Sequence, residues 1–478
     1  MFVKKSILFI LCVLSVSLVS AQKNDQKPNI VFILADDLGY GDLGVYGQKI
    51  IKTPNIDRLA QDGILFTEFY AGTSVCAPSR SSLLTGQHTG HTYIRGNKEI
   101  EPEGQEPLVD SVQTYAQLLQ EKGYTTGAFG KWGLGMVGTS GAPDKKGFDT
   151  FFGYNCQRQS HRYYPTHLWS NEQKIVLEGN DLTNKVHYAP SLIQEKTIAF
   201  IEENQNKPFF LFIPTTLPHA ELQGPDDEFY KMYANEFEEK AYKGNDYGPN
   251  ATVTGYASVE KPRATYAAMV SRMDAYVGEV IAKIEELGLS ENTIIIFSSD
   301  NGAHREGGAD PVFFNSSGNL RGYKRDLYEG GIKTPFIVKW PAKIKPGSKS
   351  DHIGSFWDIM PSFVDITKAN KPHYTDGLSF LPTLLGKTNK QKKHKYLYWE
   401  FHEDGGRQAV RMGKWKAVRL NVNKNPNGDI ELYDLSIDPK EQNNLADSNP
   451  KIVKKMKGYL QEAHRPNALF PFQSEINN

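Results

Sequence analysis

The chain has 478 residues, 39% of them hydrophobic, so it can bury a sizeable core in a large and a smaller domain, or in two to three domains. Lysine plus arginine and aspartate plus glutamate both number 55, so no overall charge favours nucleic acid or an anionic membrane. Any bound anion must therefore meet a local cluster of positive side chains.

The first 21 residues have the features of a secretory signal peptide: two lysines, an apolar stretch short for a membrane span, and small residues that end at Ala21. We expect cleavage near Ala21 and a secreted or periplasmic protein with no membrane attachment; an uncleaved anchor is the less favoured alternative. Cys12 is lost with this segment, which leaves Cys76 and Cys156. A disulfide between them is conceivable, but two cysteines do not make a disulfide scaffold.

Four apolar runs, bounded by proline, glycine and polar residues, predict buried strands. They lie within residues 28–44, 124–135, 207–222 and 292–304. Amphipathic patterns predict helices at 111–123, 191–205 and 266–288. This alternation predicts an α/β fold, with a large mixed, mostly parallel sheet between helices. Ligands of such sheets bind beyond the carboxyl ends of the strands, where each run ends near an ionisable residue.

Two regions depart from this alternation. Residues 223–263 are polar and lack periodicity, which predicts a surface insertion. Residues 365–395 are rich in lysine and proline, and short apolar runs beyond them predict antiparallel strands, with a closing helix at 450–464. We therefore expect a main domain over 22–370 and a smaller C-terminal α+β subdomain over 371–478, built on a short antiparallel sheet.

Two oxygen-bearing pairs follow predicted strands: Asp36 with Asp37, and Asp300 with Asn301. Oxygen ligands suit a hard cation such as Ca²⁺ or Mg²⁺ better than zinc. The alternative is that they are ordinary turn residues, because aspartate and asparagine are common where strands end. Two pairs at matching strand ends favour a metal site.

Cys76 precedes Pro78, which suits the first turn of a helix. A helix that begins here would place the Cys76 side chain at its N-terminus, where backbone N–H groups favour an anion. Such positions lower the pKa of a thiol, so a catalytic thiolate is one hypothesis. It requires a nearby histidine base, which the sequence does not identify.

The run "CAPSR" at 76–80 matches the Cys-x-Pro-Ser-Arg signature of the type I, formylglycine-dependent sulfatases. The stretches "ADDLGYGDLGVYG", "TPNIDRLAQDGILFTEFYAG", "GKWGLG", "SDNGAH" and "LRGYKRDLYEGGIKTPFIVKWP" follow the order of that family. From about residue 28 to its end, the chain resembles these arylsulfatase-like members of the alkaline phosphatase superfamily. The resemblance implies an alkaline-phosphatase-like fold with 22–370 as the catalytic domain.

The resemblance also implies a modified residue. In this family the cysteine becomes formylglycine (3-oxoalanine) during export, through a formylglycine-generating or an anaerobic sulfatase-maturing enzyme. Cys76 would be this residue and also a metal ligand, with Ca²⁺ the expected ion and Mg²⁺ the alternative. One hydroxyl of the hydrated aldehyde can take a sulfuryl group from an ester, and the other allows sulfate to be released.

The family assigns roles to four cationic side chains. Arg80 contacts the formylglycine, and Lys131 and Lys324 contact the sulfate oxygens. His219 contacts the bridging oxygen and donates a proton to the leaving alcohol. Judged without the family, both lysines would be ordinary solvated side chains, and His219 a loop or core histidine.

The chain departs from the family at Gly133 in "GKWGLG", where many relatives have a histidine that contacts the formylglycine. This leaves open which group takes the proton when the aldehyde is recovered; His304, a water or another loop are the alternatives.

Residues 153–169 ("GYNCQRQSHRYYPTHLW") cluster aromatic and polar side chains in a predicted loop over the site. Such a mixture suits a sugar, although loop packing is the alternative for most of the rings. We predict sugar contacts for His161 and Arg162, and for His402 and Arg407 at the rim of the pocket.

We therefore expect an exported sulfuric ester hydrolase whose substrate is a sulfated carbohydrate of glycosaminoglycan, mucin or algal origin. A phosphate or phosphonate monoester hydrolase and an inactive glycan-binding relative are the alternatives. Besides the sugar and the maturing enzyme, no nucleic acid or membrane partner is expected.

Overall fold

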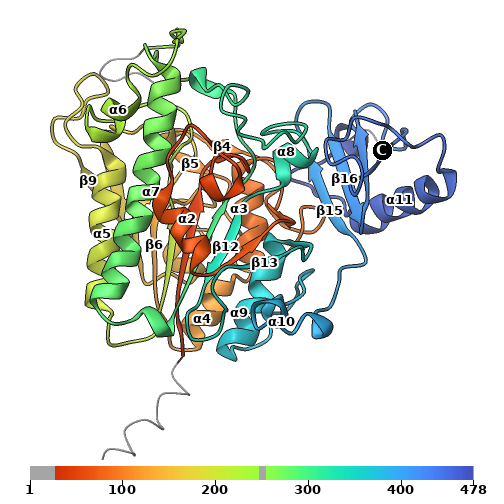
Figure 1. Cartoon of the computed structure of the whole chain (residues 1–478), viewed down its shortest axis with the longest axis horizontal. Coiled ribbons are helices and arrows are strands. Elements are labelled where there is room, and N and C mark those ends of the chain that lie inside the picture. Colours follow the sequence, from red (N-terminus) through yellow and green to blue (C-terminus); the bar gives the residue numbers. More distant parts are fainter. Residues whose placement is uncertain (1–26, 247–254, 477–478) are drawn as a thin grey trace, which may run out of the picture.

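The structure, a computed structural model, describes residues 27–246 and 255–476. The predicted signal peptide lies outside these residues. Figure 1 shows a large α/β body with a smaller C-terminal part, coloured blue, beside it. Within the described ranges, no helix combines the length and apolar character needed to cross a bilayer.

The large body is built on one mixed sheet. Its strands are β1 (Asn29–Ala35), β2 (Ile64–Phe66), β6 (Thr125–Lys131), β7 (Thr150–Tyr154), β8 (His167–Ser170), β9 (Gln173–Val176), β10 (Phe209–Pro214), β11 (Thr293–Ser299), β12 (Phe336–Lys339) and β13 (Ser348–Ser350). They form a ten-stranded sheet in the order β13-β2-β12-β11-β1-β10-β6-β7-β8-β9. The strands from β11 to β7 are parallel. The four predicted strands are β11, β1, β10 and β6, which are neighbours at the centre, so the predicted sheet is confirmed.

Helices cover both faces of this sheet. One face packs against α2 (Pro54–Gln61), α5 (Ala189–Glu203) and α7 (Pro262–Glu286), and the other against α3 (Cys76–Thr85), α4 (Tyr115–Glu121), α9 (Ile359–Thr367) and α10 (Leu381–Leu384). In β1, Val31 and Ile33 join the first core, whereas Phe32 and Leu34 join the second. Side chains alternate along a strand, so a strand buried on both faces is apolar throughout.

The predicted helices form close to the expected positions. Helix α7 begins four residues earlier than the pattern suggested, with Pro262 at its first position, where a missing N–H costs nothing. Gly123 follows α4 with φ +85° and Gly288 follows α7 with φ +68°. Both glycines take the left-handed conformation that ends a helix.

The described part of the region predicted as a surface insertion packs in part against the main body. Helix α6 (Glu228–Tyr233) packs on α7, and Tyr233 is buried. The smaller elements of the large body are β3 (Phe69–Tyr70), β4 (Glu99–Ile100), β5 (Gly104–Gln105), α8 (Glu329–Ile332) and β14 (Gly354–Ser355).

The C-terminal part contains the predicted antiparallel sheet and closing helix. Its elements are β15 (Leu397–Phe401), β16 (Arg407–Met412), β17 (Trp415–Leu420), β18 (Glu431–Asp434), α11 (Pro450–Ala463) and α12 (Gln473–Ile476). Phe380 and Leu384 still pack in the core of the large body. The chain after residue 370 therefore stays with the large body for some distance, and the small sheet begins only at Leu397.

Candidate active site

Two oxygen-rich pairs meet at the carboxyl ends of β1 and β11. These strands pair in parallel up to their last residues, so Asp36, Asp37, Asp300 and Asn301 leave the sheet side by side. The Asp37 N–H donates to Asp300 Oδ1 over 3.0 Å, and Asn301 Nδ2 donates to Asp37 Oδ1 over 2.6 Å. The structure therefore brings together all four residues that the strand ends predicted, and all four are buried.

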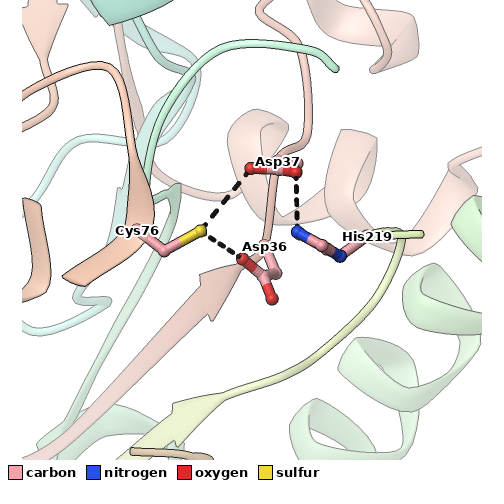
Figure 2. A group of neighbouring side chains, drawn as sticks. All are labelled: Asp36, Asp37, Cys76 and His219. Carbon is pink, nitrogen blue, oxygen red and sulfur yellow. Dashed lines mark hydrogen bonds and ion pairs between the residues drawn. The ribbon is translucent and has the colours of Figure 1, made fainter. Parts of the chain in front are cut away.

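Cys76 faces this cluster from the first position of α3. Its Sγ lies 3.4 Å from Asp36 Oδ1 and 3.8 Å from Asp37 Oδ1 (Figure 2). The side chain is 2% exposed. Cys76 and Cys156 are both free thiols, so the conceivable disulfide between them is not formed.

The surroundings of Cys76 do not favour a thiolate. Burial raises the pKa of the thiol well above its usual value; Lys131 opposes this effect, and the carboxylates of Asp36 and Asp300 add to it. A helix N-terminus lowers the pKa of a thiol only where the thiol is not desolvated among negative charges. The structure therefore gives no support to a simple catalytic thiolate.

Two lysines form ion pairs with the two carboxylates that follow β1. Lys131 Nζ lies 2.7 Å from Asp36 Oδ2, and Lys324 Nζ lies 2.8 Å from Asp37 Oδ2. Burial alone would raise the pKa of Asp36, but Lys131, as the strongest of several positive neighbours, helps to hold it well below its usual range. These lysine side chains are 0% and 5% exposed, so neither is an ordinary solvated lysine.

Asp300 and Asn301 indicate that a cation fits this cluster. Arg80 Nε donates to Asp300 Oδ2 over 3.0 Å, yet burial and the Asp36 carboxylate raise the pKa of Asp300 to about 7. The buried Oδ1 of Asn301 has no hydrogen-bond partner among the described residues. A hard divalent cation would reduce the repulsion between carboxylates and bind this orphaned oxygen.

His219 reaches the cluster from the segment after β10. Its Nδ1 hydrogen-bonds to the carbonyl oxygen of Ala220, which indicates that Nδ1 carries the proton. The Nε2 atom lies 3.2 Å from Asp37 Oδ2 (Figure 2). It also lies 3.0 Å from Lys324 Nζ. Burial and then the charge of Lys324 lower the pKa of His219 well below its usual value. A neutral His219 thus accepts a hydrogen bond from Lys324.

The rings of His161 and His304 both lie nearly parallel to the His219 ring. Their centroids are 4.6 Å and 5.7 Å from that of His219, with interplanar angles of 9° and 16°. His304 Nδ1 accepts the Glu306 N–H over 3.2 Å, and Nε2 lies 3.3 Å from the Pro218 carbonyl oxygen. Both nitrogens of His304 contact backbone, so His304 supports His219, and a role of His304 in place of the missing family histidine stays a prediction.

Arg162 points inward, to Glu221. The two side chains form an ion pair of 2.8 Å and are 6% and 0% exposed. The Glu221 N–H donates to the backbone carbonyl of His161 over 3.3 Å. Arg162 therefore supports the segment that carries His161, and direct contact between Arg162 and a sugar stays a prediction.

The two rim residues predicted from the small domain have structural contacts. His402 Nε2 lies 3.0 Å from Glu400 Oε1, and its ring stacks on Phe472 with centroids 4.2 Å apart. Arg407 donates to the backbone carbonyl of Arg325, which follows the catalytic candidate Lys324 in the chain. Arg407 thus holds the loop beside the site, whereas His402 packs the C-terminal segment; sugar contacts by either stay predictions.

Two residues of the site were missed in the sequence. Glu306 Oε2 lies 2.8 Å from Lys324 Nζ, Oε1 pairs with Arg325, and Oε2 accepts the Tyr256 hydroxyl over 2.7 Å. Glu306 lies shortly after Asn301 in the same loop, and this proximity could have identified it. Tyr256 belongs to the segment interpreted as a surface insertion and carries no comparable signal.

A side chain at Gly133 would have to displace the end of the Gln157 side chain. Its φ is +74°, and a Cβ there would lie 2.1 Å from Gln157 Nε2. That Nε2 is buried and has no hydrogen-bond partner in the described part of the chain. Gln157 therefore occupies the space in which a side chain at 133 would begin.

The fold and the site together define a hydrolase that acts on anionic esters. Comparison with known families shows which kind of ester hydrolase it is. The profile described as Sulfatase matches residues 28–369, and that of the N-sulphoglucosamine sulphohydrolase C-terminal region matches 321–465. The chain belongs to the sulfatase family and is a sulfuric ester hydrolase (EC 3.1.6.-).

The relatives match over nearly their whole length. An N-acetylgalactosamine-6-O-sulfatase of Bacteroides thetaiotaomicron is 30% identical, with 92% of this chain and 93% of the relative covered. Arylsulfatase A of Homo sapiens is 31% identical, with 90% and 87% covered. The crystal structure of Ps i-CgsB with k-i-k-neocarrahexaose is similar with a TM-score of 0.76 at 27% identity, with 95% and 96% covered.

Proposed function

We propose that this sulfatase removes sulfate groups from a carbohydrate and that it works in the periplasm or outside the cell. One relative is an N-acetylgalactosamine-6-O-sulfatase, and another was solved with a carrageenan-type hexaose. The predicted signal peptide supports export. Glycosaminoglycans, mucins and algal polysaccharides are the glycans expected as substrates.

In this proposal Cys76 is converted to formylglycine by a maturing enzyme before the protein acts. The observation that carries the proposal is the position of Cys76, buried against Asp36 and Asp37 and near Lys131 and Lys324, in a chain with the Cys-x-Pro-Ser-Arg run. Once present, the hydrated aldehyde would supply two hydroxyl groups, one to take the sulfuryl group and one to allow sulfate to leave.

A divalent cation completes the proposed site. Asp36, Asp37, Asp300, Asn301 and residue 76 would hold Ca²⁺, or alternatively Mg²⁺. Such an ion supplies positive charge at the sulfate oxygens and acidifies a neighbouring hydroxyl.

The side chains of the chain supply the remaining charge and the proton. Lys131 and Lys324 aim two ammonium groups at the cluster, where negative charge on the sulfate oxygens develops. Arg80 holds Asp300 in place. His219 Nε2 lies beside Lys324 Nζ. In this proposal the leaving alcohol is bound next to these two atoms, and the proton reaches it through His219.

Mass spectrometry of the two tryptic peptides that contain residues 76 and 156, from protein made in the native host, tests the modification. We expect an aldehyde at residue 76 and an unmodified thiol at Cys156, the matched buried cysteine. A thiol at both positions would contradict the proposal.

Kinetics test the substrate class. We expect turnover of a sulfated disaccharide and of a small aryl sulfate, both lost in Cys76→Ala and kept in Cys156→Ala. Preference for an aryl phosphate over the matching aryl sulfate would contradict sulfate-ester hydrolysis as the main activity.

A further inference from the structure

Two basic segments lie next to each other on the large body, away from the active site. Residues 341–350 and 386–395 together contain eight lysines and no aspartate or glutamate. All eight are exposed: Lys343, Lys345, Lys349, Lys387, Lys390, Lys392, Lys393 and Lys395. In a chain whose positive and negative side chains are equal in number, this is a local excess of positive charge.

Most of these lysines have no acidic partner. Among the described residues, Lys395 pairs with Glu462 over 3.1 Å, and the other seven form no ion pair. We call these seven the lysine surface. Some exposed lysines elsewhere do meet acidic neighbours, as Lys98 meets Glu106 and Lys145 meets Asp144. Unpaired charges close together repel one another, so an anion bound among them is attracted by several at once.

The lysine surface borders two adjoining cavities. The smaller, of about 210 Å³, is lined by Lys343, Lys345 and Lys349. The larger, of about 550 Å³, is lined by two cationic side chains, Lys393 and Arg411, and one acidic side chain, Asp351. Its other lining includes side chains that suit a sugar ring and its hydroxyls, among them Tyr396, Asn389 and Thr388. Ser350, Thr383 and Thr388 line both cavities, so the two are neighbours. A volume of this size is within the range of small-ligand sites.

The position of the lysine surface separates it from catalysis. Strand β13 runs parallel to β2, and β2 runs in the same direction as β1, because β12 is antiparallel to both β2 and β11. The lysines before β13 therefore lie towards the amino-end edge of the sheet, whereas Cys76 and Asp36 lie at the carboxyl-end edge. In Figure 1, β13 and α10 lie below α3 and α8.

We propose that the lysine surface is a second, non-catalytic binding site for an anionic polysaccharide chain, which keeps a polymeric substrate on the enzyme. Exposed ammonium groups pair with sulfate or carboxylate groups, and the larger cavity accepts one sugar unit of the chain. The choice of a sulfated polysaccharide rests on the proposed function.

A membrane surface is the less favoured partner. Binding in a bilayer interface needs apolar side chains that enter the acyl region as well as positive charge. The exposed large hydrophobic residues of the described chain all lie outside 341–350 and 386–395. Lysines beside cavities that present hydroxyl and amide side chains, among them Ser350, Thr388 and Asn389, fit a hydroxylated, anionic chain better.

Binding of dextran sulfate by the full mature protein tests the proposal, with uncharged dextran and phosphatidylglycerol vesicles as parallel probes. The test variants are Lys343→Gln/Lys345→Gln/Lys349→Gln and Lys390→Gln/Lys392→Gln/Lys393→Gln. The control, Lys196→Gln/Lys240→Gln/Lys451→Gln, removes three exposed lysines elsewhere that have no ion pair with any described residue, and it changes the net charge equally. Circular dichroism and melting temperature check that each variant is folded.

We expect each test variant to bind dextran sulfate about tenfold more weakly at moderate salt, the combined value of three exposed charge pairs, and the control to bind like the original protein. Turnover of a small aryl sulfate should stay unchanged in all variants, whereas KM for a sulfated polysaccharide rises only in the test variants. Equal binding by test and control variants, or binding to vesicles but not to dextran sulfate, would overturn the proposal. If the unsubstituted protein does not turn over an aryl sulfate, this would instead count against the proposed function. The two failures are distinguishable because binding of dextran sulfate is measured independently of turnover.

Discussion

The carboxylate of Glu306 lies 2.8 Å from the ammonium group of Lys324 and also receives Arg325 and the hydroxyl of Tyr256. Three donors from two segments of the chain thus converge on one side chain. Because Lys324 Nζ also contacts Asp37 and His219, Glu306 fixes the direction in which Lys324 points. Glu306 is a positioning residue for the cation expected at the sulfate group.

Glu306→Gln keeps the size of the side chain and removes its charge. We expect kcat/KM for a small aryl sulfate to fall by roughly tenfold to a hundredfold, mostly through kcat, because the misplaced Lys324 stabilises the transition state less well. Steady-state kinetics measure this, with exposed Glu236→Gln as the control. Glu306→Asp should recover part of the rate; unchanged kinetics in Glu306→Gln would exclude the positioning role.

Arg162→Ala and His161→Ala separate support from substrate contact. Removal of Arg162 breaks its ion pair with the buried Glu221, and we expect a loss of about 3 kcal/mol in the free energy of unfolding. The double variant Arg162→Ala/Glu221→Ala should lose less. His161→Ala should fold normally but turn over a sulfated sugar more slowly, with a small aryl sulfate less affected. Denaturant unfolding and kinetics measure both effects; a stable Arg162→Ala would mean that the ion pair does not support this loop.

Gly133→Ala tests the close approach of Gln157. A Cβ at this position meets Gln157 Nε2, and φ is positive, so we expect a cost of about 1–3 kcal/mol in the free energy of unfolding. Gln157→Ala in the same chain should relieve the clash but not the backbone strain, so the two effects will not add. Additive losses in urea unfolding would show that the side chains do not meet.

Asp274 gives a pH dependence of stability. Its carboxylate accepts the N–H groups of Asn55 and Ile56 at the start of α2, and burial raises its pKa from 3.8 to about 6. The folded protein then holds this proton between about pH 4 and 6, where the unfolded chain loses it, so stability falls as pH rises through that window. In Asp274→Asn this contribution disappears. We expect melting temperatures of the two proteins to agree near pH 4 and the slope between pH 4 and 6 to be shallower in the variant; equal slopes would contradict the assignment.

Chelation tests the proposed cation. Removal of a divalent ion leaves the carboxylates of Asp36, Asp37 and Asp300 to repel one another, so we expect loss of turnover and a lower melting temperature. The effect should be larger at pH 8 than at pH 5, because burial and Asp36 give Asp300 a pKa of about 7 and it is protonated at the lower pH. Ca²⁺, tested against Mg²⁺, should restore both readouts. A melting temperature that does not respond to chelator at either pH would argue against a bound ion.

Much of the fold and of the site could be predicted because the signals are local. The central strands are continuous apolar runs, and Asp36 and Asp300 follow them directly, so pairing of β1 with β11 brought them together without further information. Burial of Arg162 against Glu221 could not be predicted, because the partner lies 59 residues away with no periodic signal. Tyr256 was missed for the same reason: a polar, aperiodic segment does not indicate which of its side chains turns inward.

The burial of Cys76 sets an order of events during synthesis. The residue leaves the ribosome more than two hundred positions before Asp300, and β1 cannot gain β11 as its neighbour until that strand has also been made. Until then the strand ends that bury Cys76 are incomplete, and once the sheet is complete the side chain is 2% exposed. Under the proposed modification of Cys76, the maturing enzyme has to compete with folding, and faster folding would leave a larger share of the protein unmodified.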